Sequence, residues 1–102
     1  MSDIFQPGRT LIFTFDAFTA RVTFRGGRTL SLEIIDGENK GFADDVHYEL
    51  HAVRDDVLVL SWQEHIGSTV THVLDLEAGR SYATVAPAGS GFVRLMATVR
   101  RS

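Results

Sequence analysis

The sequence predicts a single all-β domain, an up-and-down antiparallel barrel of about eight strands. Turn-forming pairs such as Gly26-Gly27, Asp36-Gly37 and Ala78-Gly79 recur at short intervals along the chain. Between the turns lie short runs rich in Val, Thr, Phe, Leu and Ile, in which apolar and polar residues alternate. A chain of 102 residues has the length of one domain with one core, so we expect a single domain over 1–102.

The alternation is clearest from Phe18 to Arg25, where every second residue is apolar, a pattern that a helix would scramble. After the Gly26-Gly27 turn, Leu30, Leu32 and Ile34 repeat it. The predicted strands, in chain order, are 10–15, 18–25, 28–35, 46–53, 57–64, 68–75, 80–86 and 92–99.

The connections favour a closed barrel. Most are tight turns, so strands that are neighbours in sequence should pair. Such a meander has two unpaired edges, and closing the sheet on itself removes them; a two-sheet sandwich is the structural alternative. The longest connection, Asp36 to Asp45, is placed to act as a lid over one end. A barrel of about eight strands encloses either packed side chains or one small ligand.

The register of the first central hairpin selects its inward face. A three-residue loop over 54–56 would pair Val53 with Val57 and place Tyr48 opposite Trp62. The side chains predicted to face inward are then Tyr48, Leu50, Ala52, Leu58, Leu60 and Trp62.

The next hairpin decides the side of His72. A three-residue loop over 65–67 would pair Glu64 with Ser68 and Leu60 with His72, so that His72 points inward beside Val70 and Leu74. A two-residue Ile66-Gly67 turn would shift the pairing and send His72 to the outside.

Together these registers predict a small-ligand site at one end of an apolar interior. Apolar walls with a few convergent polar groups are typical of ligand pockets. The predicted ligand-binding residues are Phe24, Tyr48, Trp62, Glu64 and His72, with Phe13 and Phe15 as further walls. Each also has a structural interpretation: Tyr48 and Trp62 as core aromatics, Glu64 as a solvated rim carboxylate, and His72 as a structural histidine.

A second polar set lies at His47, Glu49 and His51, which share one face of a strand. Two His and one carboxylate are the ligands of some non-haem iron sites. The register that buries Tyr48 turns this set outward, so we expect no metal site. We also expect no cofactor, because Cys is absent and the sequence has neither a phosphate loop nor a dinucleotide fingerprint.

Charge and hydropathy exclude other classes. The net charge is −3, and Arg21, Arg25 and Arg28 are interpreted as the solvated face of one strand, so a nucleic-acid partner is not expected. No apolar run approaches the roughly 20 residues of a membrane span, and no signal-peptide pattern opens the chain. We therefore expect a cytoplasmic protein without a membrane partner.

The segment from Leu60 to Asp75 contains Ser61-Trp62-Gln63-Glu64, a Gly-containing turn, then Thr69-Val70-Thr71-His72-Val73 and an acidic residue. This pattern resembles the MoaF-like family, whose members have a calycin-type, lipocalin-like barrel. Tyr48 and Gly79 also stand where the family pattern places them. The resemblance implies a single small-molecule-binding calycin; it supplies no catalytic residues, and a role in molybdenum-cofactor assembly is not inherited with the name.

Three functions remain open. The first is a protein that binds a small, partly apolar ligand, for which an aromatic compound suits the walls. The second is a cofactor-free isomerase, cyclase or lyase in which Glu64 or His72 is the general acid or base. The third is a self-associating module, a homodimer through an outward face of Val57, Val59, Thr69, Thr71 and Val73.

Overall fold

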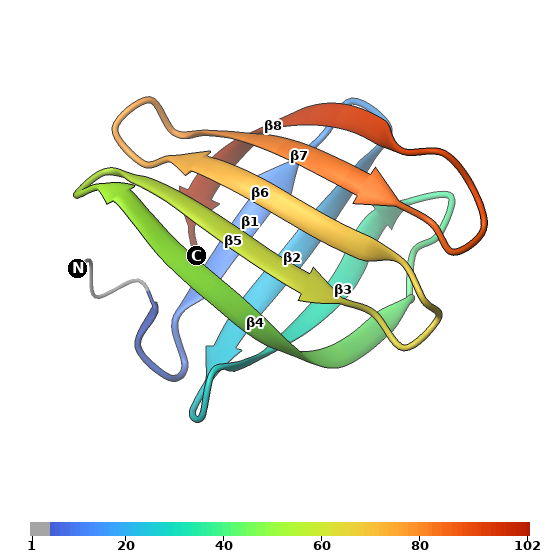
Figure 1. The fold of residues 1–102 in the computed structure, drawn as a ribbon, viewed down its shortest axis with the longest axis horizontal. Helices are drawn as coiled ribbons and strands as arrows, with labels where there is room; N and C mark the ends of the chain where they lie inside the picture. Colours follow the sequence, from blue (N-terminus) through green and yellow to red (C-terminus); the bar gives the residue numbers. More distant parts are fainter. Residues whose placement is uncertain (1–4) are drawn as a thin grey trace.

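The computed structural model describes residues 5–102, which form a closed antiparallel barrel (Figure 1). Each strand pairs with the next, and β1 pairs with β8 from Leu11 opposite Arg101 to Thr14 opposite Thr98. The strands are β1 (Thr10–Thr14), β2 (Phe18–Arg25), β3 (Thr29–Gly37), β4 (Ala43–Arg54), β5 (Val57–Gln63), β6 (Thr69–Asp75), β7 (Arg80–Ala86) and β8 (Val93–Arg101). The predicted all-β, eight-stranded, calycin-like up-and-down barrel is therefore confirmed.

The central hairpins have the predicted register with one difference. Tyr48 lies opposite Trp62, and Leu60 lies opposite His72. The predicted pairing of Val53 with Val57 is wrong. Arg54 pairs with Val57, and Val53 is the extra residue of a β-bulge. Because Val53 is left unpaired, the turn has two residues, Asp55 and Asp56, and not the predicted three. The pairs beyond the bulge, from Ala52 with Leu58 to Tyr48 with Trp62, are those that were predicted.

The connection between β3 and β4 is shorter than predicted. β3 continues to Gly37 and β4 already begins at Ala43, so only residues 38–42 connect them. Gly37 has φ +109° and a Cβ there would lie 2.7 Å from Cβ of Phe18, which only glycine avoids. Gly37 is the last residue of β3 and pairs with Phe18, the first residue of β2, so the two strands end level before the chain turns back.

The two ends of the barrel differ in how they are filled. The packed end carries the β2–β3, β4–β5 and β6–β7 connections. There, Phe24 meets Tyr48 edge to face, with ring centroids 5.5 Å apart, and Phe5 packs on Phe24 from outside at 4.9 Å. The open end carries the β1–β2, β3–β4, β5–β6 and β7–β8 connections (Figure 1). The candidate site lies at this end.

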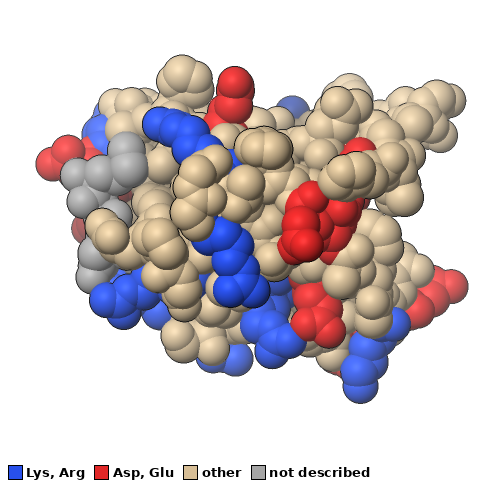
Figure 2. All heavy atoms as spheres, turned by 90° about the horizontal axis from the view of Figure 1, so that it is seen from below, with Lys and Arg blue, Asp and Glu red and all other residues tan. Residues whose placement is uncertain are grey.

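Charged side chains gather on the outer faces of β2, β3 and β4. Arg21 forms an ion pair with Glu33 on the neighbouring strand, and Nε of Arg25 donates to the Ser31 hydroxyl. Figure 2, seen from below the view of Figure 1, shows basic and acidic groups close together. Arg21, Arg25 and Arg28 are exposed, as expected; Arg21 and Arg25 share the outer face of β2, whereas Arg28 lies in the β2–β3 turn and not on the same strand.

The outer faces of β5 to β8 carry fewer charges. Val59, Val73, Tyr82 and Met96 form one row across these four strands. The residues named above for self-association alternate with buried positions and so face outward; a homodimer through them stays a prediction. Within residues 5–102 there is no helix long and apolar enough to cross a membrane.

Candidate functional site

A cavity of about 500 Å³ opens at the open end of the barrel. Its walls are mainly apolar and come from all strands except β4, together with the connections at this end. Small inward residues leave the space, because Ala20 on β2 and Ala83 on β7 stand where longer side chains would fill the barrel. The lining residues are Phe13, Phe15, Phe18, Ala20, Val22, Leu32, Ile34, Asn39, Lys40, Phe42, Trp62, Glu64, Ile66, Val70, His72, Ala83, Val85, Val93 and Leu95.

His72 is the deepest polar group of the lining, with only 4% of its surface exposed. Its Nδ1 lies 2.7 Å from the hydroxyl of Ser81, which is itself fully buried on the neighbouring strand β7. The ring lies between aromatic neighbours, with centroids 4.5 Å from Phe13 and 5.3 Å from Trp62. Burial lowers the pKa of His72 to about 4, so the imidazole is neutral at pH 7.

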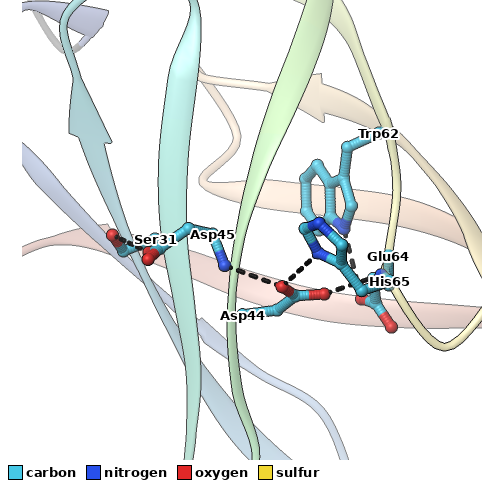
Figure 3. Close-up of polar contacts among 6 residues, drawn as sticks. All are labelled: Ser31, Asp44, Asp45, Trp62, Glu64 and His65. Carbon is cyan, nitrogen blue, oxygen red and sulfur yellow. Dashed lines mark hydrogen bonds and ion pairs between the residues drawn. The ribbon is translucent and has the colours of Figure 1, made fainter.

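Glu64 lies immediately after β5 and is half-buried. Its Oε2 accepts a hydrogen bond from Nε1 of Trp62 at 3.2 Å (Figure 3). Burial raises the pKa of Glu64, and the nearby charge of Asp44 raises it further, whereas the hydrogen bond from Trp62 acts in the opposite direction. This carboxyl group can therefore hold or release a proton closer to neutral pH than an exposed glutamate does.

Asp44 joins β4 to the β5–β6 turn beside this cavity. β4 pairs with β5 from Tyr48 onward, so within residues 5–102 the segment 43–47 of β4 has no strand partner on that side. In place of backbone pairing, the Asp44 carboxylate accepts hydrogen bonds from the backbone N–H of His65 at 2.8 Å and from its Nδ1 at 2.7 Å (Figure 3). Burial acts to raise the pKa of Asp44, but the hydrogen bonds from His65 outweigh it and leave that pKa below its usual value.

The predicted site residues divide between the two ends. Trp62, Glu64 and His72 line the cavity, as do the predicted wall residues Phe13 and Phe15. Tyr48 and Phe24 do not: both are buried at the packed end and contact each other there. Tyr48 is the cross-strand neighbour of Trp62, but its ring packs toward Phe24 and not toward the cavity.

The structure adds residues that the sequence analysis missed. Ser81 orients His72, and the alternation of β7 could have placed it inward with Ala83 and Val85. Asp44 was not predicted as a site residue, because the strand was expected to begin at residue 46. The strand begins at Ala43, and Asp44 lies two residues before Val46, on the same face of the strand as Val46 and Tyr48. The predicted lid contributes Asn39, Lys40 and Phe42 to the lining.

The polar set His47, Glu49 and His51 faces outward and is exposed. Within the described part of the chain, no group of three or more His, Asp or Glu residues is arranged to hold a metal ion. The arrangement therefore offers a neutral imidazole, a half-buried carboxyl group and aromatic walls, which can receive a small molecule through packing and one or two hydrogen bonds.

Comparison with known proteins identifies the fold and the family of the chain. The chain matches no curated protein. Among solved structures, one described as "a putative beta-lactamase from Burkholderia vietnamiensis" is 31% identical, covers 94% of each chain and superposes with a TM-score of 0.89. The family model described as MoaF-like matches residues 7–100. The resemblance noted in the sequence is thus confirmed, and the chain belongs to the MoaF-like family.

Proposed function

We propose that this protein binds a small molecule in the cavity at the open end of its barrel. The observation that supports this most directly is the unfilled volume of about 500 Å³ in a barrel whose other end is closely packed. That volume falls within the range of ligand pockets, roughly 300–1,000 Å³. Empty space beside Ala20 and Ala83 lowers stability relative to a filled core, and a ligand that occupies it recovers the lost contacts.

A cavity-filling variant tests this function. Val85 is half-buried on β7 and lines the cavity, so Val85→Phe should occupy part of the ligand volume. Val73→Phe adds the same atoms on the outer face of β6 and serves as the matched control. A panel of small aromatic compounds is screened by thermal shift and by the fluorescence of Trp62, which lines the cavity.

We expect at least one compound to raise the melting temperature of the unmodified protein and of Val73→Phe, with about a tenfold or greater loss of affinity in Val85→Phe. Equal affinity in both variants would place the ligand outside the cavity. A panel in which no compound binds the unmodified protein would contradict the proposed function.

A second candidate is a cofactor-free isomerase, cyclase or lyase. The observation in its favour is that Glu64 and His72 line one cavity and have pKa values shifted in opposite directions, which suits them to exchange protons with a bound molecule. It predicts that a compound bound by the unmodified protein is slowly converted, with conversion abolished and binding retained in Glu64→Gln. One-dimensional NMR of the compound over time measures this, and an unchanged spectrum counts against catalysis.

The description of the Burkholderia structure does not lead us to propose β-lactam hydrolysis here. A serine enzyme of that kind uses a Ser-x-x-Lys motif, and the single lysine, Lys40, has Gly37 three positions before it. Ser81, which bonds to His72, is fully buried and does not line the cavity, so its hydroxyl is not presented to a substrate.

A further inference from the structure

The free nitrogen of His72 is the starting point for identifying the ligand class. Nδ1 is engaged by Ser81, which holds the ring in one orientation. In residues 5–102, every side-chain nitrogen or oxygen that is fully shut off from solvent has a hydrogen-bond partner. Since His72 has no partner other than Ser81 within those residues, its Nε2 must remain accessible, and the space it reaches is the cavity.

We propose that the cavity selects an uncharged aromatic molecule whose hydroxyl group forms a hydrogen bond with Nε2 of His72. This proposal rests on the proposed function, because it names the class of ligand for the same cavity. It assigns His72 as the residue that determines specificity and the surrounding aromatic rings as the surfaces that hold the flat ligand.

The distribution of charge in the cavity lining is the reason why we expect an uncharged ligand. Among the residues that the structure describes, two charged ones, Glu64 and Lys40, belong to the lining, and both are more exposed than His72. Deeper inside, the imidazole of His72 is neutral and its neighbours are Phe13 and Trp62. An ionic group placed beside the imidazole would lose its hydration next to Phe13, Trp62 and Ser81, none of which carries a charge, and this is strongly unfavourable.

The pairing of His72 with Ser81 carries the requirement for a hydroxyl group. Either Nδ1–H donates to the Ser81 hydroxyl and Nε2 is an acceptor, or Ser81 donates and Nε2–H is a donor. A hydroxyl group both donates and accepts, so it satisfies Nε2 in either tautomer, whereas an ether or carbonyl oxygen satisfies only one of them.

A series of naphthalenes separates these requirements. 2-Naphthol, naphthalene, 2-naphthoate and 2-naphthylmethylammonium share one ring system and differ in their polar group. Isothermal titration calorimetry at pH 7 should show that 2-naphthol binds about tenfold tighter than each of the other three, because only it forms the neutral hydrogen bond. The double variant His72→Phe/Ser81→Ala removes this bond without leaving an unpaired serine, and His47→Phe on the outer surface is the matched control.

The double variant should bind naphthol and naphthalene equally, and His47→Phe should keep the preference for naphthol. Tighter binding of the carboxylate or the ammonium compound would overturn the proposed ligand class while leaving a binding cavity in place. A naphthol preference that survives in the double variant would overturn the role of His72. If none of the four naphthalenes binds, and no compound of the aromatic panel binds either, the result would count against the proposed function itself.

Discussion

The packed end and the open end of this barrel share the same strands and the same alternation, yet one is solid and the other is hollow. At the packed end the inward positions hold large residues such as Phe24, Leu30 and Leu58, which are almost fully buried. At the open end they include Ala20 and Ala83, and the space left over forms the cavity. Closure of eight strands therefore sets an interior volume, whereas the size of the inward side chains decides whether that volume is filled.

The two ends also differ in polarity. Glu64 and His72 both face the hollow part, where each has one hydrogen-bond partner, Trp62 for the first and Ser81 for the second. A polar group inside a barrel lowers stability unless it is paired, and these two groups are paired on one side only. Their remaining atoms are available to a ligand.

The largest expected effect tests the difference in packing. Phe24→Ala should lower the free energy of unfolding by about 3–5 kcal/mol, because the ring is fully buried. Phe15→Ala at the open end should lower it by about 1–2 kcal/mol, because that ring is half-buried beside the cavity. Urea denaturation measures both values.

Should Phe24→Ala fail to fold, the milder pair Phe24→Leu and Phe15→Leu preserves the comparison. Equal decreases in the free energy of unfolding at the two positions would show that the two ends are packed alike, contrary to this expectation.

An effect of pH tests the burial of the imidazole. The unfolded chain takes up a proton on His72 near pH 6.5, whereas the folded protein resists protonation until about pH 4. Burial of neutral His72 therefore does not reduce the free energy of unfolding above pH 6.5. As the pH falls from 6.5 toward 4, protonation of His72 in the unfolded chain lowers the free energy of unfolding by about 3 kcal/mol in total.

The measurement is the free energy of unfolding at pH 7 and at pH 4.5, compared between the unmodified protein and His72→Phe/Ser81→Ala. The variant should lose less stability on acidification, because the other titrating groups are common to both proteins. His47→Gln, a change at an exposed position, should behave like the unmodified protein. Identical pH dependence in the double variant would mean that His72 is solvated in the folded state.

The smallest expected effect concerns the hydrogen bonds from His65 to Asp44. Asp44→Asn should change overall stability by less than about 1 kcal/mol, because His65 is largely exposed. It should, however, speed amide hydrogen exchange in the β5–β6 turn, at Glu64 and Gly67, whose N–H groups bond across that turn. The packed end should be unaffected, and faster exchange on both ends would show that the barrel responds as one unit.

Much of the architecture was readable from local patterns. Turn residues mark where strands end, and period-two alternation marks which side chains share a face. Because a shift of one residue in the pairing would move every apolar side chain to the solvent face, the alternation favours one register. The pairing of Tyr48 with Trp62 could be predicted in this way, whereas the side of His72 depended on whether the 65–67 turn has three residues or two, and the structure has the inward alternative. The bulge at Val53 was not predicted, because only Arg54 follows it in β4 and a single residue does not reveal the shift in alternation that an extra residue causes.

The site was only half readable, for a related reason. Alternation tells which side chains face inward but not how far along the barrel each one lies, so Phe24 and Tyr48 were grouped with Trp62 and His72 although they lie at the packed end. The partners of the polar groups also depend on neighbouring strands, and Ser81 meets His72 only because β7 pairs with β6.

Local patterns in the sequence predict a barrel of hairpins, and one of the two registers left open for the 65–67 turn places His72 inside it with Trp62 and Glu64. Ala52, which was predicted to face inward, is exposed near the end of β4. Only the tertiary structure decided that one end is solid and the other hollow. Filling depends on the sum of side-chain volumes brought together from eight strands at the same height, and that sum exists only once the barrel has closed.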